Sequence, residues 1–190
     1  IQIDVLQNDD AETAQTHPVT LLITDRGIGI GREDLATMTR VGASYRETWK
    51  RSVYERMPVW MRPSGAFGIG LQSLFLVTDE LSIQSQSFMS RELLRLRMTN
   101  PVGDERGSIY IQKAPNTHTY SESGTRVQLH LKKNFIDAFQ IRRAPFEHFD
   151  PITPREVDYF SGVLSHLPVP VLINGKVHGD SKLMSLQWHY

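Results

Sequence analysis

The sequence of 190 residues contains no cysteine. Disulfide bonds, thiolate zinc sites and thiol nucleophiles are therefore excluded, and a cytoplasmic location is expected. An excess of charge of either sign is also lacking, because 21 lysines and arginines balance 21 aspartates and glutamates. No overall field attracts nucleic acid or an anionic membrane, so any anion-binding site must be local.

Long apolar runs are missing as well. The longest apolar stretch, 69–77, is interrupted by Gln72 and Ser73 and is far shorter than the roughly 20 residues that span a bilayer. No membrane span is expected. The sequence shows no signal-peptide pattern and opens at Ile1 with the alternation of a strand, so we expect a fragment of a longer protein.

What is present is the composition of a folded domain, with 39% hydrophobic and 22% charged residues. Alternation and glycine turns predict an α/β fold: a two-layer sandwich of a mixed, mostly antiparallel sheet and helices. Residues 8–18 are expected to form a polar loop, and the strands from residue 93 onward an antiparallel meander. The expected strands are 1–6, 19–24, 80–87, 93–98, 108–113 and 125–131, and the expected helices are 32–40 and 71–77.

The last part of the sequence has its own pattern. A linker rich in Pro, Phe and His occupies 142–152, and Thr153-Pro154-Arg155-Glu156 is a capping-box pattern that predicts a helix to about residue 166. Asn174-Gly175 between the segments 169–173 and 176–178 predicts a hairpin with a type I′ turn. We therefore expect one domain over 1–141, and a linker, helix and hairpin of a following region over 142–190.

Two glycine-rich segments could contact phosphate or a nucleotide. The first, 25–29, reads Asp-Arg-Gly-Ile-Gly, and Arg32 stands where a dinucleotide fingerprint needs its third glycine. The second, 65–70, reads Gly-Ala-Phe-Gly-Ile-Gly, and Leu71 and Gln72 follow where a P-loop needs Lys and Ser or Thr. Neither common phosphate-binding loop is present.

The two segments, together with Gly124-Thr125 and in this order, resemble the GHKL superfamily of ATPases. That superfamily includes the ninety-kilodalton heat-shock (Hsp90) chaperones, the type II topoisomerases, the mismatch-repair ATPases and the sensor histidine kinases. The resemblance covers roughly 1–133, and the stretches 23–44 and 65–87 look most like the chaperones. It implies the histidine-kinase-like ATPase fold, with 1–141 as an ATP-binding domain shortened at its N-terminus.

The resemblance implies a role for each matching residue. Asp25 would accept a hydrogen bond from the amino group of adenine, and Thr125 would hold a water shared with Asp25. Gly27 and Gly29 would let the backbone lie close to the base, and Ile30 would offer an apolar wall.

Further roles fall on the second glycine segment. Its glycines would form the hinge of an ATP lid over 41–64 and present backbone N–H groups to the triphosphate. The expected nucleotide-binding residues are Asp25, Gly27, Gly29, Ile30, Ser44, Gly65, Phe67, Gly68, Gly70 and Thr125.

Catalytic residues cannot be assigned in this sequence. In the superfamily a helix before the first strand carries a glutamate that activates water and an asparagine that coordinates Mg²⁺, and no segment here matches it. We therefore expect the Mg²⁺ ligand to lie upstream of Ile1 and name no metal ligand in this chain. The parent protein is expected to be an ATPase, and this chain alone is expected to hydrolyse ATP poorly or not at all.

The function implied by the resemblance is ATP binding and lid closure coupled to conformational change, with a homodimer and protein clients as partners. One alternative is an ATP-sensing regulatory module that does not hydrolyse. Another is the ATPase domain of a topoisomerase-like or mismatch-repair-like protein, with nucleic-acid contact left to other domains. On the residues alone, Asp25 could be an ordinary turn aspartate and 65–70 a structural turn.

Overall fold

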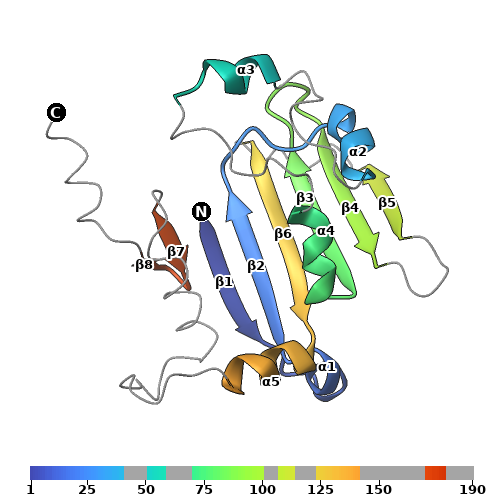
Figure 1. Ribbon diagram of the computed structural model, residues 1–190, viewed down its shortest axis with the longest axis vertical. Coiled ribbons are helices and arrows are strands. Elements are labelled where there is room, and N and C mark those ends of the chain that lie inside the picture. The colour runs from blue at the N-terminus through green and yellow to red at the C-terminus, as the bar shows by residue number, and fades with distance from the viewer. Residues whose placement is uncertain (41–50, 59–69, 101–106, 114–122, 142–169, 179–190) are drawn as a thin grey trace, which may run out of the picture. The chain divides into compact units, whose positions relative to one another are not determined.

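The computed structural model describes residues 1–40, 51–58, 70–100, 107–113, 123–141 and 170–178. It confirms the predicted α/β class with a mixed, mostly antiparallel sheet and helices (Figure 1). The chain divides into two compact units, one of Ile1–Arg26 with Thr125–Tyr190 and one of Gly27–Gly124.

The first unit is built on strands that run in the order β6-β2-β1-β7-β8. β1 pairs antiparallel with β2, and β2 pairs antiparallel with β6. β7 pairs parallel with β1 and antiparallel with β8. The strands are β1 (Gln2–Gln7), β2 (Val19–Asp25), β6 (Gly124–Leu131), β7 (Val171–Ile173) and β8 (Lys176–His178).

One face of these strands is apolar. Odd-numbered residues of β1, β2 and β6 share that face because side chains alternate along a strand and the register pairs odd with odd. Burying this face supplies the main stabilisation of the unit. Its buried apolar residues are Ile3, Val5, Val19, Leu21, Leu129 and Leu131, and Val171 and Ile173 of β7 are buried as well.

The prediction of a polar loop over 8–18 was wrong, because α1 (Ala11–Thr16) lies within it. Asp10 caps this helix, and its carboxylate accepts a hydrogen bond of 2.8 Å from the backbone N–H of Thr13. A second helix, α5 (Lys133–Ile141), follows β6 and was not predicted. Figure 1 shows α1 and α5 at the same end of β1, β2 and β6.

The C-terminal hairpin was predicted correctly. Asn174 and Gly175 have φ angles of 47° and 78°, the two positive values that a type I′ turn requires. The Asn174 side chain also accepts a hydrogen bond of 2.7 Å from the N–H of Val5, which ties the turn to β1. The predicted linker and the helix at 153–166 lie outside the described residues, so the boundary at residue 142 stays a prediction.

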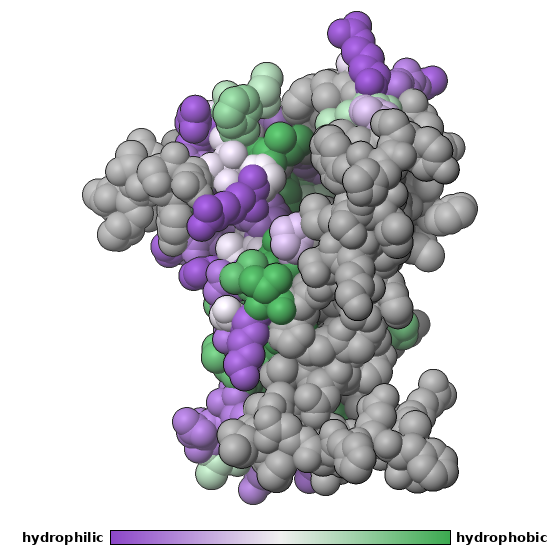
Figure 2. Space-filling model, turned by 90° about the vertical axis from the view of Figure 1, so that its left-hand side faces the viewer, coloured by the Kyte–Doolittle hydropathy of each residue, from purple (hydrophilic) through white to green (hydrophobic). Residues whose placement is uncertain are grey.

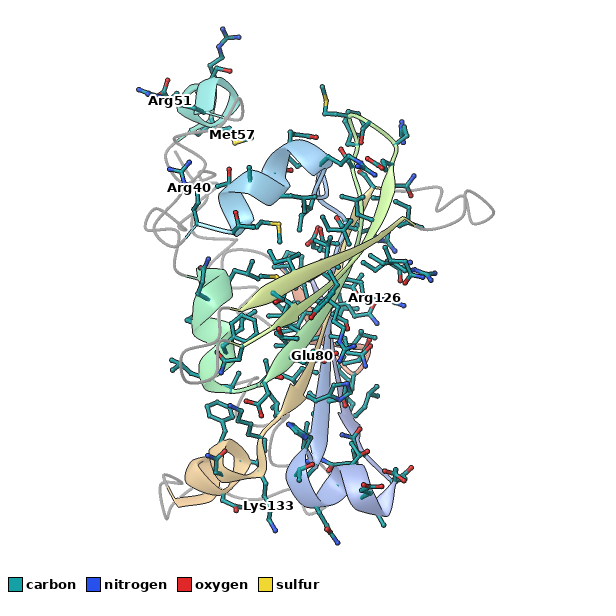
Figure 3. The ribbon with its side chains drawn as sticks, turned by 90° about the vertical axis from the view of Figure 1, so that its right-hand side faces the viewer. Arg40, Arg51, Met57, Glu80, Arg126 and Lys133 are labelled. Carbon is teal, nitrogen blue, oxygen red and sulfur yellow. The ribbon has the colours of Figure 1, made fainter. Side chains whose placement is uncertain are left out.

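The second unit contains the antiparallel meander β3-β4-β5. The strands are β3 (Glu80–Gln86), β4 (Leu93–Thr99) and β5 (Ser108–Lys113), and the helices are α2 (Arg32–Met38), α3 (Arg51–Arg56), α4 (Gly70–Ser73) and a 3₁₀ turn at Leu74–Leu76. Figures 1 and 3 place α2 and α4 on one face of the meander. The residues that alternate inward are Leu81, Ile83 and Ser85 on β3 and Leu94, Leu96 and Met98 on β4.

One strand pairing differs from the prediction. The strand 125–131 was expected to extend the meander after 108–113, but it pairs with β2. The alternation of apolar residues identified the strand correctly. It could not identify the neighbour, because any strand with one apolar face satisfies the same pattern.

The surface of the described residues is mixed. On the face in Figure 2, apolar side chains lie in small groups between polar ones. Scattered exposed apolar residues of this kind, such as Leu6 and Val177, are common on folded proteins. None of the helices in the described ranges is long and apolar enough to cross a bilayer.

Candidate functional site

The first glycine turn lies along the end of β3 in the second unit. The carbonyl oxygen of Ile28 accepts a hydrogen bond of 2.8 Å from the N–H of Phe88. Two residues later, the N–H of Ile30 donates to the hydroxyl oxygen of Ser85 at 2.8 Å. Residues 28–30 are thus anchored on residues 85–88 at both ends.

Gly29 sits between these two anchors and has a φ of 68°, a value that favours glycine. A Cβ atom at this position would overlap the carbonyl oxygen of Gln86 and lie 2.6 Å from its carbonyl carbon. The backbone of the turn therefore touches the backbone of β3 directly. Both the φ angle and the close approach require glycine here.

Ser85 holds this contact from the buried side of β3. Its side chain is 1% exposed. Besides accepting from Ile30, its hydroxyl donates a hydrogen bond of 3.0 Å to the carbonyl oxygen of Gly124. Sequence reasoning missed this residue, although a serine in the alternating series Leu81, Ile83, Ser85 was the available signal.

Asp34 fixes the end of the turn where α2 begins. Its carboxylate accepts a hydrogen bond of 2.9 Å from the N–H of Gly31, and the residue is 8% exposed. An acidic residue at the third helical position commonly satisfies a free N–H before a helix in this way. The pattern Gly31-Arg32-Glu33-Asp34 carried this signal, and sequence reasoning did not use it.

Asp25 and Thr125 lie opposite one another in the first unit. They are register partners at the ends of β2 and β6, and both are partly buried. They share the odd-numbered face whose preceding pairs are Leu21 with Leu129 and Ile23 with Val127. A carboxylate and a hydroxyl therefore terminate an apolar row, which is a suitable chemistry for recognising a flat base with one polar edge.

The remaining predicted residues are distributed as follows. Gly27 belongs to the second unit with Gly29 and Ile30, and Gly70 is the exposed first residue of α4. Ser44, Gly65, Phe67 and Gly68 lie outside the described residues. Of the predicted lid over 41–64, the structure describes 51–58, where α3 carries an ion pair of 2.6 Å between Arg51 and Glu55.

The described residues offer no ligand set for a metal ion. Within 1–40, 51–58, 70–100, 107–113, 123–141 and 170–178, no group of three or more His, Cys, Asp or Glu residues could hold one.

Comparison with known proteins adds independent information. No protein-family model matches the chain. The chain is 35% identical over 140 residues to the chaperone protein HtpG of Methylobacterium nodulans, an alignment that covers 70% of this chain and 21% of HtpG. It is 30% identical over 127 residues to the endoplasmin homolog of Dictyostelium discoideum, covering 65% of this chain and 16% of that protein.

Solved structures agree on the fold. The ATPase region of topoisomerase II from Saccharomyces cerevisiae matches with a TM-score of 0.51 and 16% identity, over 93% of this chain and 42% of that chain. The ATPase and transducer domains of topoisomerase II from Balamuthia mandrillaris match with a TM-score of 0.52 and 16% identity, over 98% and 44%. At this identity the likeness shows the fold alone.

The chain spans about a fifth of the length of the HtpG proteins that it matches. Its relatives in sequence are Hsp90-family chaperones, and its neighbours in structure are ATPase domains of the GHKL type. The chain therefore has the fold of GHKL-type ATPase domains and is related in sequence to the Hsp90-family chaperones.

Proposed function

We propose that this chain binds ATP and ADP, with adenine recognised at Asp25 and Thr125. The observation that supports this most is the pairing of these two residues at the end of an apolar strand face. The apolar face of a base could pack against these strands while the polar edge of the base contacts the carboxylate. The homology to Hsp90-family chaperones supports the same assignment.

The carboxylate of Asp25 selects adenine over guanine in this proposal. An ionised carboxylate only accepts hydrogen bonds, and adenine presents an amino group at the position where guanine presents a carbonyl oxygen. Guanine would place two acceptors against each other and leave both without a donor in a partly buried site, which lowers its affinity. Thr125, with a hydroxyl that both donates and accepts, would hold a water between the base and Asp25.

The glycine turn and Gly70 complete the proposed site. Gly27, Gly29 and Ile30 would contact the nucleotide through the backbone and the Ile30 side chain, and Gly70 would belong to the phosphate-binding segment with Gly65, Phe67 and Gly68. Ser44 is proposed as a further nucleotide-binding residue. Mg²⁺ would neutralise phosphate charge when bound.

For the parent protein we propose slow ATP hydrolysis coupled to lid closure and dimerisation. These changes would drive a chaperone-like conformational cycle that acts on protein clients. The names of the relatives, chaperone protein HtpG and endoplasmin homolog, support a chaperone over a topoisomerase. A regulatory module that binds ATP without hydrolysis is the second candidate. The cytoplasmic location stays a prediction.

Calorimetric titration of the chain with ATP, ADP and GTP, each with and without Mg²⁺, tests the proposal. We expect ATP and ADP to bind and GTP to bind at least about tenfold more weakly. Asp25→Asn should weaken ATP binding by about tenfold or more, because it removes the charge from the acceptor. Asp9→Asn, at an exposed carboxylate beside α1, is the matched control and should bind ATP like the wild type.

Two results would overturn the proposal. One is no heat of binding at millimolar ATP or ADP, with or without Mg²⁺. The other is an Asp25→Asn variant with the same ATP affinity as the wild type, which would remove Asp25 from the site.

A further inference from the structure

We propose that Ser85 is a positioning residue for the nucleotide site, with its hydroxyl holding the glycine turn 27–31 in the geometry that binding needs. This inference rests on the proposed ATP binding. Ser85 itself would not touch the nucleotide. It would act through Ile30, which follows Gly29 in the turn.

The hydroxyl of Ser85 both donates one hydrogen bond and accepts another. The single hydroxyl proton is donated to the carbonyl oxygen of Gly124 at 3.0 Å. A lone pair then accepts the N–H of Ile30 at 2.8 Å. Two backbone groups from distant parts of the sequence are therefore joined through one oxygen atom.

Ser85 is a buried polar residue on a strand face that is otherwise largely apolar. The side chain is 1% exposed and follows Leu81 and Ile83 on the inward face of β3, where an apolar residue would be expected. Burying a hydroxyl without partners destabilises a protein, whereas burying one with its partners satisfied costs little. Here the partners are the glycine turn and the residue before Thr125.

The geometry of the turn makes it sensitive to this bond. Gly29 already touches the backbone of Gln86, so the turn cannot move toward β3. The hydrogen bond from the N–H of Phe88 to the carbonyl oxygen of Ile28 holds one side of the turn, and the hydrogen bond from the N–H of Ile30 to Ser85 holds the other. Loss of the second bond would let Ile30 move away from β3, and small displacements of a preorganised site weaken binding strongly.

The same hydroxyl also restrains Gly124, which directly precedes Thr125 in the sequence. Removing it would free the backbone at Ile30 and at Gly124 together. The expected loss of affinity is therefore larger than the loss from an equally buried hydroxyl elsewhere in the unit.

Thr78 provides that comparison. It is 0% exposed, and its hydroxyl donates a hydrogen bond of 2.6 Å to the carbonyl oxygen of Glu80 at the opposite end of β3. The test compares Ser85→Ala, Ser85→Thr and Thr78→Val with the wild type. ATP affinity is measured by calorimetry, thermal stability by unfolding, and the exchange rate of the Ile30 amide by NMR.

We expect Ser85→Ala to weaken ATP binding about tenfold and to speed exchange at Ile30 by a similar factor, because an N–H loses its acceptor. Ser85→Thr keeps the hydroxyl and should restore both to within about threefold of the wild type. Thr78→Val should lower thermal stability and leave ATP affinity and Ile30 exchange unchanged. If Ser85→Ala fails to fold, Ser85→Cys is used in its place, because a thiol has a similar volume and is a much weaker hydrogen-bonding group.

The outcomes separate the two proposals. If the wild type binds no ATP, the proposed function fails, and the role of Ser85 in binding fails with it. If the wild type binds and Ser85→Ala binds within about twofold as well, or exchange at Ile30 is unchanged, Ser85 is not a positioning residue while the proposed function stands. An equal loss of affinity in Thr78→Val would assign the effect of Ser85 to general stability.

Discussion

Asp25 and Thr125 are direct register partners on adjacent antiparallel strands, at the end of the row that pairs Leu21 with Leu129 and Ile23 with Val127. Side chains directly opposite in such a pair have Cβ atoms about 4.5–5.5 Å apart. A single water can join groups at that spacing. The pairing therefore gives a structural reason for these two residues to act together.

A double-mutant cycle tests whether they do. Asp25→Asn and Thr125→Val should each weaken ATP binding, and the double variant should lose less than the sum, because both hold the same water. Calorimetry on the four proteins gives the coupling. Thr24→Val on the opposite face of β2 is the control and should leave ATP affinity unchanged. Additive losses for Asp25 and Thr125 would contradict a shared water.

Three glycine variants separate the causes of strain. Gly29→Ala combines a positive φ with overlap of Gln86 and should lower the free energy of unfolding by about 3 kcal/mol or more. Gly175→Ala has a φ of 78° but no described atom within 4 Å of the added Cβ, so about 1 kcal/mol is expected. Gly70→Ala has neither problem and should be neutral. Urea unfolding measures all three, and equal losses at Gly29 and Gly175 would contradict the close approach.

A buried polar network in the first unit should contribute to its stability. The hydroxyl of Thr20 donates to the side-chain oxygen of Asn8 at 2.9 Å and lies 2.9 Å from the Nδ1 of His130. Thr20 is 5% exposed, so Thr20→Val would leave two polar groups without this partner and lower the free energy of unfolding by about 1–3 kcal/mol.

Thr39→Val is the control for that substitution. Its exposed hydroxyl donates to the carbonyl oxygen of Ala36 at 2.9 Å, where water can replace it. Urea unfolding should show a change within about 0.5 kcal/mol for Thr39→Val. A similarly small change for Thr20→Val would show that the network adds nothing to stability.

The cap of α1 should depend on pH. Hydrogen bonds from the side chain and then the backbone N–H of Thr13 lower the pKa of Asp10. Because the pKa is lower in the folded state, the carboxylate stabilises the fold above its unfolded pKa. That contribution is lost as the pH falls through the folded pKa. The stability difference between the wild type and Asp10→Ala should therefore be largest near neutral pH and shrink on acidification.

Asp9→Ala is the control for the pH series, because Asp9 is exposed and precedes the cap. Thermal unfolding of the wild type and both variants over the acidic range measures the effect. A difference between the wild type and Asp10→Ala that stays constant with pH would assign the effect of Asp10 to helix propensity instead of charge.

Much of the fold could be predicted because its signals are local. Alternation in 80–87 and 93–98 identified β3 and β4, and Asn174-Gly175 identified a turn whose φ angles the structure confirms. The partner of β6 could not be predicted, because pairing with β2 joins residues about a hundred positions apart and leaves no trace in local periodicity. α1 was missed because its six residues carry no buried side chain and hence no apolar stripe.

The candidate site followed the same division. The glycines of the pattern Asp-x-Gly-x-Gly predicted a turn, and the resemblance predicted a water shared by Asp25 and Thr125. The register places these two residues opposite one another, and their role in binding stays a prediction. Ser85 was missed: its place in the alternating apolar series of β3 was the available signal, but its two hydrogen bonds are seen only in the structure.

The most direct test of the central claim is a titration of the isotope-labelled chain with ADP, followed by the amide signals in two-dimensional NMR. We expect saturable shifts concentrated at Asp25, Thr125 and the turn 27–30, and much smaller shifts for Asp25→Asn at the same ADP concentration. Shifts confined to other parts of the chain, or none at millimolar ADP, would contradict the claim that this domain binds a nucleotide through these residues.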